Sequence, residues 1–327
     1  MKSLFLILLT LSLPLFAAKN LEIFFVDVEG GQATLVKAPG GESILFDTGW
    51  AGFENRDANR IAAAAQKAGI SKIDYLVITH FHADHVGGIH QLAAKLPIVH
   101  VVDHGKTVET AANQTKLYTD YEAMTGKVKR ITVKPGDKLP IKGLNVEILA
   151  AHGSTSKRPG KPNPLCSSVM RKEEDKTDNA QSVGTLITYG KFRFLDLGDL
   201  TWNKELDLVC PDNRIGKVDL YLTTHHGTDS SGPAALVHAI APTVAVMNNG
   251  EKKGGTPPAW KVVRESPGLK DFWQVHYSAA GGSESNTDEK LIANLKGEDS
   301  GNYLAVTADS NGKFTVTNSR NGFSKSY

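Results

Sequence analysis

The sequence predicts an α/β protein of four layers, in which two mixed β-sheets pack face to face and helices cover their outer faces. Two observations support this fold class. Strand-rich halves with interspersed helical segments lie on either side of a polar stretch at 152–179. Forty per cent of the 327 residues are hydrophobic, which is enough to bury a sizeable core. No linker separates two independent cores, so residues 19–327 are expected to form one domain.

The first eighteen residues have the pattern of an export signal. Lys2 precedes an apolar run at 4–15, and small residues close the run at Ala17 and Ala18. The run is shorter than a comfortable membrane span, and no cysteine follows Ala18 to accept a lipid. We therefore expect cleavage after Ala18 and a secreted or periplasmic protein without a stable membrane anchor. An uncleaved N-terminal anchor is the alternative.

The first half reads as a β-meander followed by a strand–helix–strand unit. Apolar β-formers broken by glycine turns predict three antiparallel strands within 21–49. An alanine-rich helix at 57–70, a strand at 73–79, a helix at 89–95 and a strand at 98–102 follow. Sheets of this kind place ligands beyond the carboxyl ends of their strands. A site is therefore expected where the strand at 73–79 ends.

A longer helix is expected at 108–123, before the polar stretch. The second half begins with two β-rich runs joined at Gly190, continues with an apolar strand before a pair of histidines, and ends in a hairpin turned at Asn311–Gly312. A polar stretch as long as 152–179 is usually functional or disordered. Outside the cytosol, Cys166 and Cys210 could form a disulfide, and two buried thiols are the alternative.

The overall charge gives no sign of a nucleic-acid binder. Thirty-seven basic and 35 acidic residues leave a net charge of +2, so no global field attracts long duplex DNA. A small or surface-attached anionic substrate would have to be drawn in locally. Candidate cations for this are Lys157, Arg158, Lys161, Arg171, Lys172, Lys252 and Lys253. Acidic neighbours at 173–175 partly cancel the first five, for which a solvated loop is the alternative.

The most informative stretch is "THFHADHVGG", which follows directly on an apolar strand. Imidazole nitrogen and carboxylate oxygen are the ligands that suit zinc and similar divalent ions. Histidines two apart on a tight loop can point the same way, so His80 and His82 are expected to hold one metal. Asp84 and His85 would face a second metal close to the first, and Gly87–Gly88 would permit close backbone approach.

The order of motifs along the chain resembles the metallo-β-lactamase superfamily. "HFHADH" is similar to its H-x-H-x-D-H signature, "ILFDTG" to its early aspartate motif, "FLDLGD" to its bridging-aspartate motif and "LTTHHG" to its final histidine motif. The turn "VDVEGGQA", with "GD" and "HHG", most resembles the hydrolase domain of DNA-uptake competence proteins and secreted phosphorylcholine esterases. The resemblance implies an αββα sandwich and a metal-dependent hydrolase.

The resemblance also implies a ligand set for two metals. The first metal is expected on His80 and His82, the second on Asp84, His85 and His225, with Asp199 bridging both and Asp47 orienting a ligand from behind. Independently of the family, Asp47 stands at a strand end, and carboxylates near metal sites commonly fix a histidine tautomer. A turn-capping aspartate is the alternative. Asp196 is expected to be structural.

Two assignments are choices between neighbours. Adjacent residues of a strand point to opposite faces, so only one of His225 and His226 should bind metal. We assign His225 as the ligand and His226, together with Asp84, as catalytic, with His226 facing the substrate or donating a proton. The family's third histidine on the first metal has no sharp match. His152 is the best candidate, an ordinary surface histidine is the alternative, and His104 is the fallback, with a supporting or structural role expected for it.

These expectations lead to a hydrolase with two divalent ions, zinc first and manganese or iron as alternatives, which activate a bridging water. Antibiotic-hydrolysing members of the family commonly lack the bridging aspartate and several use a cysteine ligand, whereas Asp199 is present here and both cysteines lie outside the motifs. The sequence therefore favours phosphodiester hydrolysis. Lactone or thioester hydrolysis, a single-iron sulfur dioxygenase and a non-catalytic binding module are the alternatives.

Overall fold

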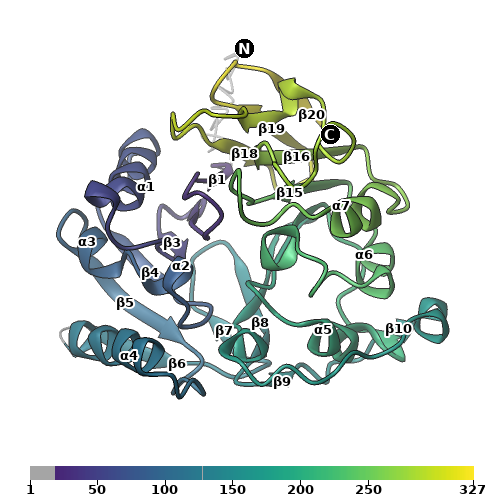
Figure 1. The fold of residues 1–327 in the computed structure, drawn as a ribbon, viewed down its shortest axis with the longest axis horizontal. Coiled ribbons are helices and arrows are strands. Elements are labelled where there is room, and N and C mark those ends of the chain that lie inside the picture. Colours follow the sequence, from purple (N-terminus) through teal and green to yellow (C-terminus); the bar gives the residue numbers. More distant parts are fainter. Residues whose placement is uncertain (1–18, 127) are drawn as a thin grey trace, which may run out of the picture.

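The computed structural model describes residues 19–126 and 128–327, so the expected export signal at 1–18 lies outside the described residues. Two large β-sheets face each other, with α1, α3 and α4 along one outer face and α5, α6 and α7 along the other (Figure 1). The predicted four-layered fold class is therefore confirmed. Within the described part of the chain, no helix has the length and apolar character needed to cross a membrane.

The first sheet combines an antiparallel half with a parallel half. Its strand order is β20-β19-β18-β1-β2-β3-β4-β5-β6, with parallel pairing from β3 to β6 and antiparallel pairing elsewhere. The predicted meander and the strand–helix–strand unit are both present. The strands are β1 (Leu21–Phe25), β2 (Thr34–Lys37), β3 (Ser43–Phe46), β4 (Ile73–Val77), β5 (Ile98–Asp103), β6 (Lys129–Thr132), β18 (Leu304–Ala308), β19 (Phe314–Asn318) and β20 (Ser324–Ser326).

The second sheet has the order β17-β16-β15-β14-β12-β11-β8-β7, and β9 pairs with β8. Strands β12, β14, β15, β16 and β17 run parallel, whereas β7, β8, β9, β11 and β12 pair antiparallel. The strands are β7 (Lys138–Leu139), β8 (Asn145–Ala151), β9 (Ser154–Thr155), β11 (Gly184–Tyr189), β12 (Phe192–Asp196), β14 (Leu220–Leu222), β15 (Val244–Met247), β16 (Asp271–His276) and β17 (Ile292–Asn294). A separate pair joins β10 (Lys161–Pro162) to β13 (Asp212–Asn213).

The three helices expected at 57–70, 89–95 and 108–123 are present, the last with a later start, whereas α5 and α7 were not predicted. The helices are α1 (Arg56–Lys67), α2 (Ala83–Val86), α3 (Ile89–Ala93), α4 (Ala112–Thr125), α5 (Trp202–Val209), α6 (Ala234–Ile240) and α7 (Pro257–Arg264). The helix expected from residue 108 begins only at Ala112. The backbone N–H of Val108 instead donates to the Asp178 carboxylate at 3.0 Å, which holds this segment as a loop.

Strand alternation explains how the layers separate. Leu21, Ile23 and Phe25 of β1 point into the core between the sheets, where the rings of Phe25 and Phe194 meet edge to face at 5.8 Å. Phe24 points the other way, into the core beneath α1, α3 and α4. A third apolar core lies between the second sheet and helices α5, α6 and α7. The central core fixes how the strand ends of the two sheets face one another.

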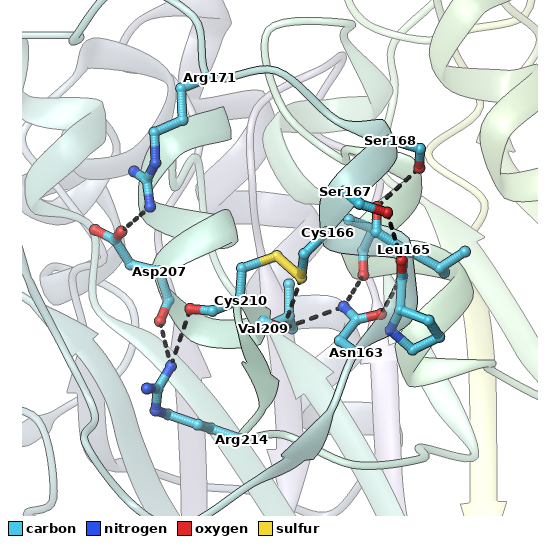
Figure 2. Close-up of a disulfide and its surroundings, with 12 residues drawn as sticks. Asn163, Leu165, Cys166, Ser167, Ser168, Arg171, Asp207, Val209, Cys210 and Arg214 are labelled. Carbon is cyan, nitrogen blue, oxygen red and sulfur yellow. Dashed lines mark hydrogen bonds and ion pairs between the residues drawn. A yellow bond between two sulfur atoms is a disulfide. The ribbon is translucent and has the colours of Figure 1, made fainter.

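The polar stretch at 152–179 is held to the second sheet's helical layer by a disulfide. Cys166 and Cys210 are bonded, with Cα atoms 5.7 Å apart, so the alternative of two free thiols does not hold (Figure 2). The side chain of Asn163 donates to the carbonyl of Val209 at 3.1 Å, and Arg171 forms an ion pair with Asp207 at 2.6 Å. These contacts attach the stretch to α5.

Removing the disulfide should destabilise the protein. The bond links residues 44 positions apart, and a cross-link of this kind limits the freedom of the unfolded chain. We expect the double variant Cys166→Ser, Cys210→Ser to lose about 2–4 kcal/mol of unfolding free energy. Urea unfolding with and without a reductant measures this, because reduction should weaken only the wild type. Equal unfolding midpoints of oxidised wild type and variant would contradict the prediction.

Candidate metal centre

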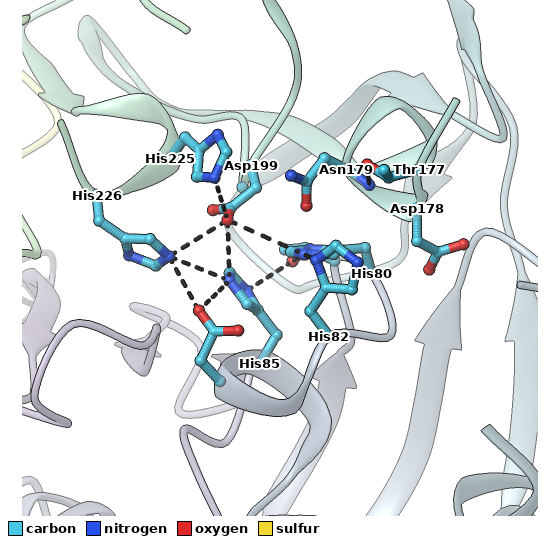
Figure 3. A network of polar contacts seen from close by, with 12 residues as sticks. His80, His82, His85, Thr177, Asp178, Asn179, Asp199, His225 and His226 are labelled. Carbon is cyan, nitrogen blue, oxygen red and sulfur yellow. Dashed lines mark hydrogen bonds and ion pairs between the residues drawn. The ribbon is translucent and has the colours of Figure 1, made fainter. Parts of the chain in front are cut away.

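The site lies where strands of both sheets end. Asp47 follows β3 and His80 follows β4 in the first sheet, while Asp199 follows β12 in the second. His225 and His226 follow β14 within a short 3₁₀ turn, Thr224–Gly227. Figure 3 shows the imidazoles arranged around the Asp199 carboxylate. The strand–loop pattern of the sequence thus brings the predicted residues to one edge of the sandwich.

Four buried side chains form the tightest group. The potential ligand atoms of Asp84, His85, Asp199 and His226 all lie within 4.8 Å of one another. The Nε2 atoms of His85 and His226 are each 3.3 Å from Oδ2 of Asp84 and 3.3 Å from Oδ2 of Asp199. Two nitrogen and two carboxylate donors therefore converge on one point, called here the second position.

A second convergence, called here the first position, lies on the other side of Asp199. Nε2 of His80 faces Nδ1 of His82 at 3.0 Å and lies 4.0 Å from Oδ2 of Asp199. His80 comes from the loop after β4, and His82 precedes helix α2 as its N-cap residue. Asp199 therefore has its Oδ2 within 4.0 Å of ligand nitrogens from both positions.

Two carboxylates outside the group of ligand histidines each fix the tautomer of one histidine. A carboxylate only accepts, so Nδ1 of His85 donates to Oδ2 of Asp47 at 2.7 Å, and Nε2 of His82 donates to Oε1 of Glu109 at 3.0 Å. The opposite nitrogen of each ring then faces the centre, where it can offer a lone pair when the ring is neutral. Asp47 is itself held by the N–H and hydroxyl of Thr79, at 2.8 and 2.6 Å. Such outer contacts orient and tune metal ligands.

The carboxylates at the centre are held ionised. Burial opposes ionisation of Asp199, but the neighbouring His226, His85 and His225 keep its pKa well below the ordinary value. Burial likewise opposes ionisation of Asp84, and His85 with His226 keep its pKa well below the ordinary value. Burial and the positive charge of His85 hold the pKa of His80 well below normal, so this imidazole is neutral. Burial opposes protonation of His85, but Asp199, Asp84 and Asp47 hold its pKa well above normal, so a metal at this position would have to displace that proton. Anionic oxygens and imidazole nitrogens are the donor types that suit a divalent cation.

Unpaired atoms show that a cation fits this donor set. Oδ1 of Asp199 is buried and has no hydrogen-bond partner among the described residues. The ring nitrogens of His80 and His82 face each other, as do those of His85 and His226 at 3.2 Å. A buried charged oxygen without a partner is costly, and a metal would satisfy it and bind the facing nitrogens.

Close backbone packing holds the ligand loop in place. A Cβ atom on Gly88 would lie 2.2 Å from the carbonyl oxygen of Thr48, so only glycine fits there, as the sequence predicts. The N–H of Thr48 in turn donates to the carbonyl of His85 at 2.7 Å. The loop after β3 therefore carries Asp47 and also supports the helix that carries Asp84 and His85.

Residues 26–157, which include the whole histidine-rich stretch, match the Metallo-beta-lactamase superfamily. This part of the chain is therefore similar to that superfamily.

Two curated proteins are similar to most of this chain. Recombination protein 2 of Haemophilus influenzae is 26% identical over 227 residues, 69% of this chain and 24% of its own. ComE operon protein 3 of Bacillus subtilis is 23% identical over 256 residues, 74% of this chain and 30% of its own. The chain therefore spans less than a third of each. The metallo-beta-lactamase fold protein YhfI from Bacillus subtilis superposes with a TM-score of 0.48 at 12% identity, over 88% of this chain and all of that one.

The two adjacent histidines differ from their expected places. His226, assigned from sequence to the substrate side, is fully buried in the four-residue group of the second position. His225, assigned as the ligand, lies outside that group, with 18% of its side chain exposed and Nδ1 bonded to the Ser230 hydroxyl at 2.9 Å. Both residues have left-handed backbone angles, with φ of 55°, so the rule of alternating strand faces does not apply to them.

The candidates for the third histidine of the first metal lie away from it. His152 is exposed, and among the described residues no hydrogen bond or ion pair joins its ring to the other predicted ligands. Nε2 of His104 donates to Asp178 at 3.2 Å, and Asp178 accepts from the N–H of Phe81 at 2.8 Å. His104 therefore supports the ligand loop from behind, which agrees with the structural role foreseen for it.

Sequence reasoning missed two groups beside the candidate metal site. Glu109, which orients His82, was placed inside a predicted helix. Lys253 was noted only as part of a cationic pair, yet its ammonium forms an ion pair with Asp84 and lies 5.3 Å from the centre of the Trp50 ring. Asp196 is structural as expected, since it accepts from Gln32 at 2.9 Å and from the N–H of Gly198 at 3.0 Å.

A separate buried group of Asp27, Glu29 and His276 also has the composition of a metal site. The group already contains a cation, because Arg60 forms an ion pair with Asp27 at 2.8 Å. Nε2 of His276 contacts Glu29 at 3.0 Å. These contacts join the loop after β1 to α1 and β16, so the group stabilises the fold.

Asp47 should tune metal affinity without touching the metal. Changing Asp47 to Asn removes the acceptor that fixes the His85 tautomer, so we expect metal affinity to fall by about 10–100-fold. Competition with a chromogenic zinc chelator measures it. Asp196→Asn is the matched control, because Asp196 is equally buried but contacts no metal-site histidine. Equal losses in both variants would contradict the specific role of Asp47.

Proposed function

We propose that this protein is a dinuclear metal-dependent phosphodiesterase. The observation that carries the proposal is the buried Asp199 carboxylate between two groups of ligand nitrogens, with Oδ2 4.0 Å from His80 and 3.3 Å from both His85 and His226. A binding module has no need for an ionised carboxylate between two such groups.

Each position would hold one divalent ion. His80, His82 and Asp199 would bind the first, and Asp84, His85, His226 and Asp199 would bind the second. When bound, two such ions lower the pKa of a shared water and neutralise charge on the attacking and leaving oxygens. Asp47 and Glu109 would keep the imidazoles in the metal-binding tautomer. The chain itself needs to supply no nucleophile.

Lys253 supports an anionic substrate. Its ammonium pairs with Oδ2 of Asp84, the same oxygen that lies 3.3 Å from both His85 and His226. A metal at the second position would take that oxygen, and the ammonium would then lack its partner. A phosphate oxygen on the substrate is a suitable replacement. Lys253 would thus offer positive charge only at a loaded centre.

The basic residues of the polar stretch are less suited to binding an anionic substrate than Lys253 is. Arg158 is paired with Glu147 at 2.7 Å and Arg171 with Asp207 at 2.6 Å. The Lys172 ammonium lies 3.8 Å from the centre of the Trp202 ring and donates to the carbonyl of Asp229. These contacts stabilise the polar stretch, so recognition of a phosphodiester would depend on the metals and Lys253.

A cavity beside the centre suits a small leaving group. It has a volume of about 340 Å³, and Trp202, Thr201 and Ser230 are among its lining residues. Ser230 bonds His225, whose Nε2 lies 3.4 Å from Asp199. His225 would therefore stand between the metals and this cavity, where it can donate a hydrogen bond to the leaving oxygen. Sequence analysis expected His226 to face the substrate or donate a proton. In this proposal, His225 has that role.

We also propose that the enzyme works outside the cytosol. The disulfide between Cys166 and Cys210 supports this, because such bonds persist in oxidising compartments. The substrate would then be small or attached to a surface.

A substrate panel tests the reaction class. Metal-loaded protein should hydrolyse bis(p-nitrophenyl) phosphate faster than a chromogenic cephalosporin or a simple lactone, because two metals and Lys253 stabilise developing phosphate charge. Asp199→Asn should remove this activity. Dominant lactone or cephalosporin turnover would replace the phosphodiesterase assignment, and oxygen consumption with a thiol substrate would indicate a dioxygenase.

Lys253 should contribute to substrate binding. Losing one hydrogen bond to a charged group weakens binding by about tenfold or more, so Lys253→Met should raise KM for the phosphodiester by that factor. Metal content should stay at the wild-type value. Lys252→Met is the matched control, since Lys252 is an exposed neighbour and its loss should leave KM unchanged. Similar KM values in both variants would exclude Lys253 from substrate recognition.

A further inference from the structure

The first position has fewer ligands than the second. His80 and His82 supply two nitrogens and Asp199 supplies an oxygen, whereas four side chains meet at the second position. Three protein donors and a shared water would make the first position four-coordinate, whereas the four side chains of the second position with the same water would make it five-coordinate. One further protein donor would make the two positions equal in number of ligands. Among the described residues, no hydrogen bond or ion pair joins His152 or His104 to His80, His82 or Asp199, and the rings of His152 and His104 instead lie 6.4 Å apart. The question is which other group of this chain stands there.

One candidate comes from the end of the polar stretch. Asn179 lies in a short 3₁₀ helix, Asp178–Gln181, whose first N–H groups are capped by the Thr177 hydroxyl. The carboxylate of Asp178 accepts from the N–H of Phe81 at 2.8 Å. The N–H of Val183 donates to the carbonyl of Thr79 at 2.8 Å. The segment is therefore tied on both sides of Asn179 to the loop that carries His80.

The side chain of Asn179 points at the centre. Figure 3 shows its amide directed toward the imidazoles of His80 and His82, on the side away from His226. Asn179 is only 9% exposed, and its Oδ1 is buried without a hydrogen-bond partner among the described residues. A buried carbonyl oxygen without a hydrogen bond is unfavourable, so this oxygen needs a partner.

We propose that Oδ1 of Asn179 is a ligand of the metal at the first position, in the place of a third histidine. The inference rests on the proposed dinuclear centre and adds one donor to it. Amide carbonyl oxygens coordinate cations such as Mn²⁺ and Ca²⁺ and satisfy an otherwise unpaired acceptor. Two neighbouring imidazoles and a carboxylate complete the set.

An amide oxygen makes the two positions unequal. It is neutral and harder than imidazole, so it suits Mn²⁺ better than a third histidine would. The first position has one carboxylate and the second has two. The second position should therefore bind its ion more tightly, and the first should be the exchangeable one.

Metal titration of the metal-free protein tests the proposal. Calorimetric titration with Mn²⁺ and with Zn²⁺ should resolve a tight and a weaker site in the wild type. Asn179→Ala should keep the tight site and lose at least about tenfold in affinity at the weaker one, since even indirect support of a metal ligand is worth that much. Asn179→Asp keeps an oxygen donor and should restore binding at the weaker site.

His152→Ala is the matched control, because it removes the histidine that the sequence favours for the same role. It should leave both affinities unchanged. Circular dichroism and thermal unfolding of the metal-free variants check that each one folds, and Asn179→Asp covers the case in which Asn179→Ala does not. Electron paramagnetic resonance of Mn²⁺-loaded protein adds a second readout, because spin coupling between two ions should disappear in Asn179→Ala.

The outcomes separate this inference from the proposed function. Two sites in the wild type with unchanged affinities in Asn179→Ala would overturn the ligand role and leave the dinuclear centre intact. Unchanged affinities with a raised KM would assign Asn179 to the substrate instead. A wild type that binds fewer than two ions would overturn both proposals. Loss of the weaker site in His152→Ala would return the role to His152.

Discussion

The structure depends on one electrostatic constraint, the ionised carboxylate of Asp199 in a buried setting. An isolated charge at this depth would be strongly unfavourable, so the fold must surround it with positive charge and donors. His80 and His85 reach it from the first sheet, and His225 and His226 reach it from the second. Only strand ends that face each other across the central core allow this, which is why the site requires both halves of the chain.

That constraint also explains the carboxylates farther out. Once the inward nitrogens face Asp199 and Asp84, the outward N–H of each ring needs an acceptor, and Asp47 and Glu109 provide it. Burial raises the pKa of Asp47, while His85 and Thr79 act in the opposite direction. The network therefore extends from the bridging carboxylate through an imidazole to a second carboxylate, as metal sites commonly require.

Sequence alone could predict what depends on local pattern. The alternation of Leu21, Ile23 and Phe25 and the turn at Asn311–Gly312 determine strands and a hairpin through period and turn chemistry. The metal ligands at 80–85 could be recognised from the sequence because all four donors lie within six positions. The four layers could be predicted because each half has to bury both faces of its sheet, one against the other sheet and one against helices.

Some features of the site could not be predicted from the sequence. They depend on unusual backbone angles and on contacts between residues far apart in the chain. His225 and His226 exchange places because both leave the strand in the left-handed region, where side-chain alternation gives no guidance. Glu109 reaches His82 only because the helix begins later than its composition indicates. Asn179 approaches the site through bonds to Phe81 and Thr79, nearly one hundred positions away.

Because of Lys253, the net charge of the site depends on whether a metal is bound at the second position. Without a cation at the second position, its ammonium offsets the negative charge of Asp84. A metal at the second position would repel the Lys253 ammonium and bind the Asp84 oxygen in its place. Binding of one metal would therefore supply a Lewis acid and also free the ammonium to bind an anion. The open side of the centre would then present positive charge beside His225, while the buried side stays closed by His226. Under the proposed function, an anionic substrate would meet a complementary surface only after the second position is filled.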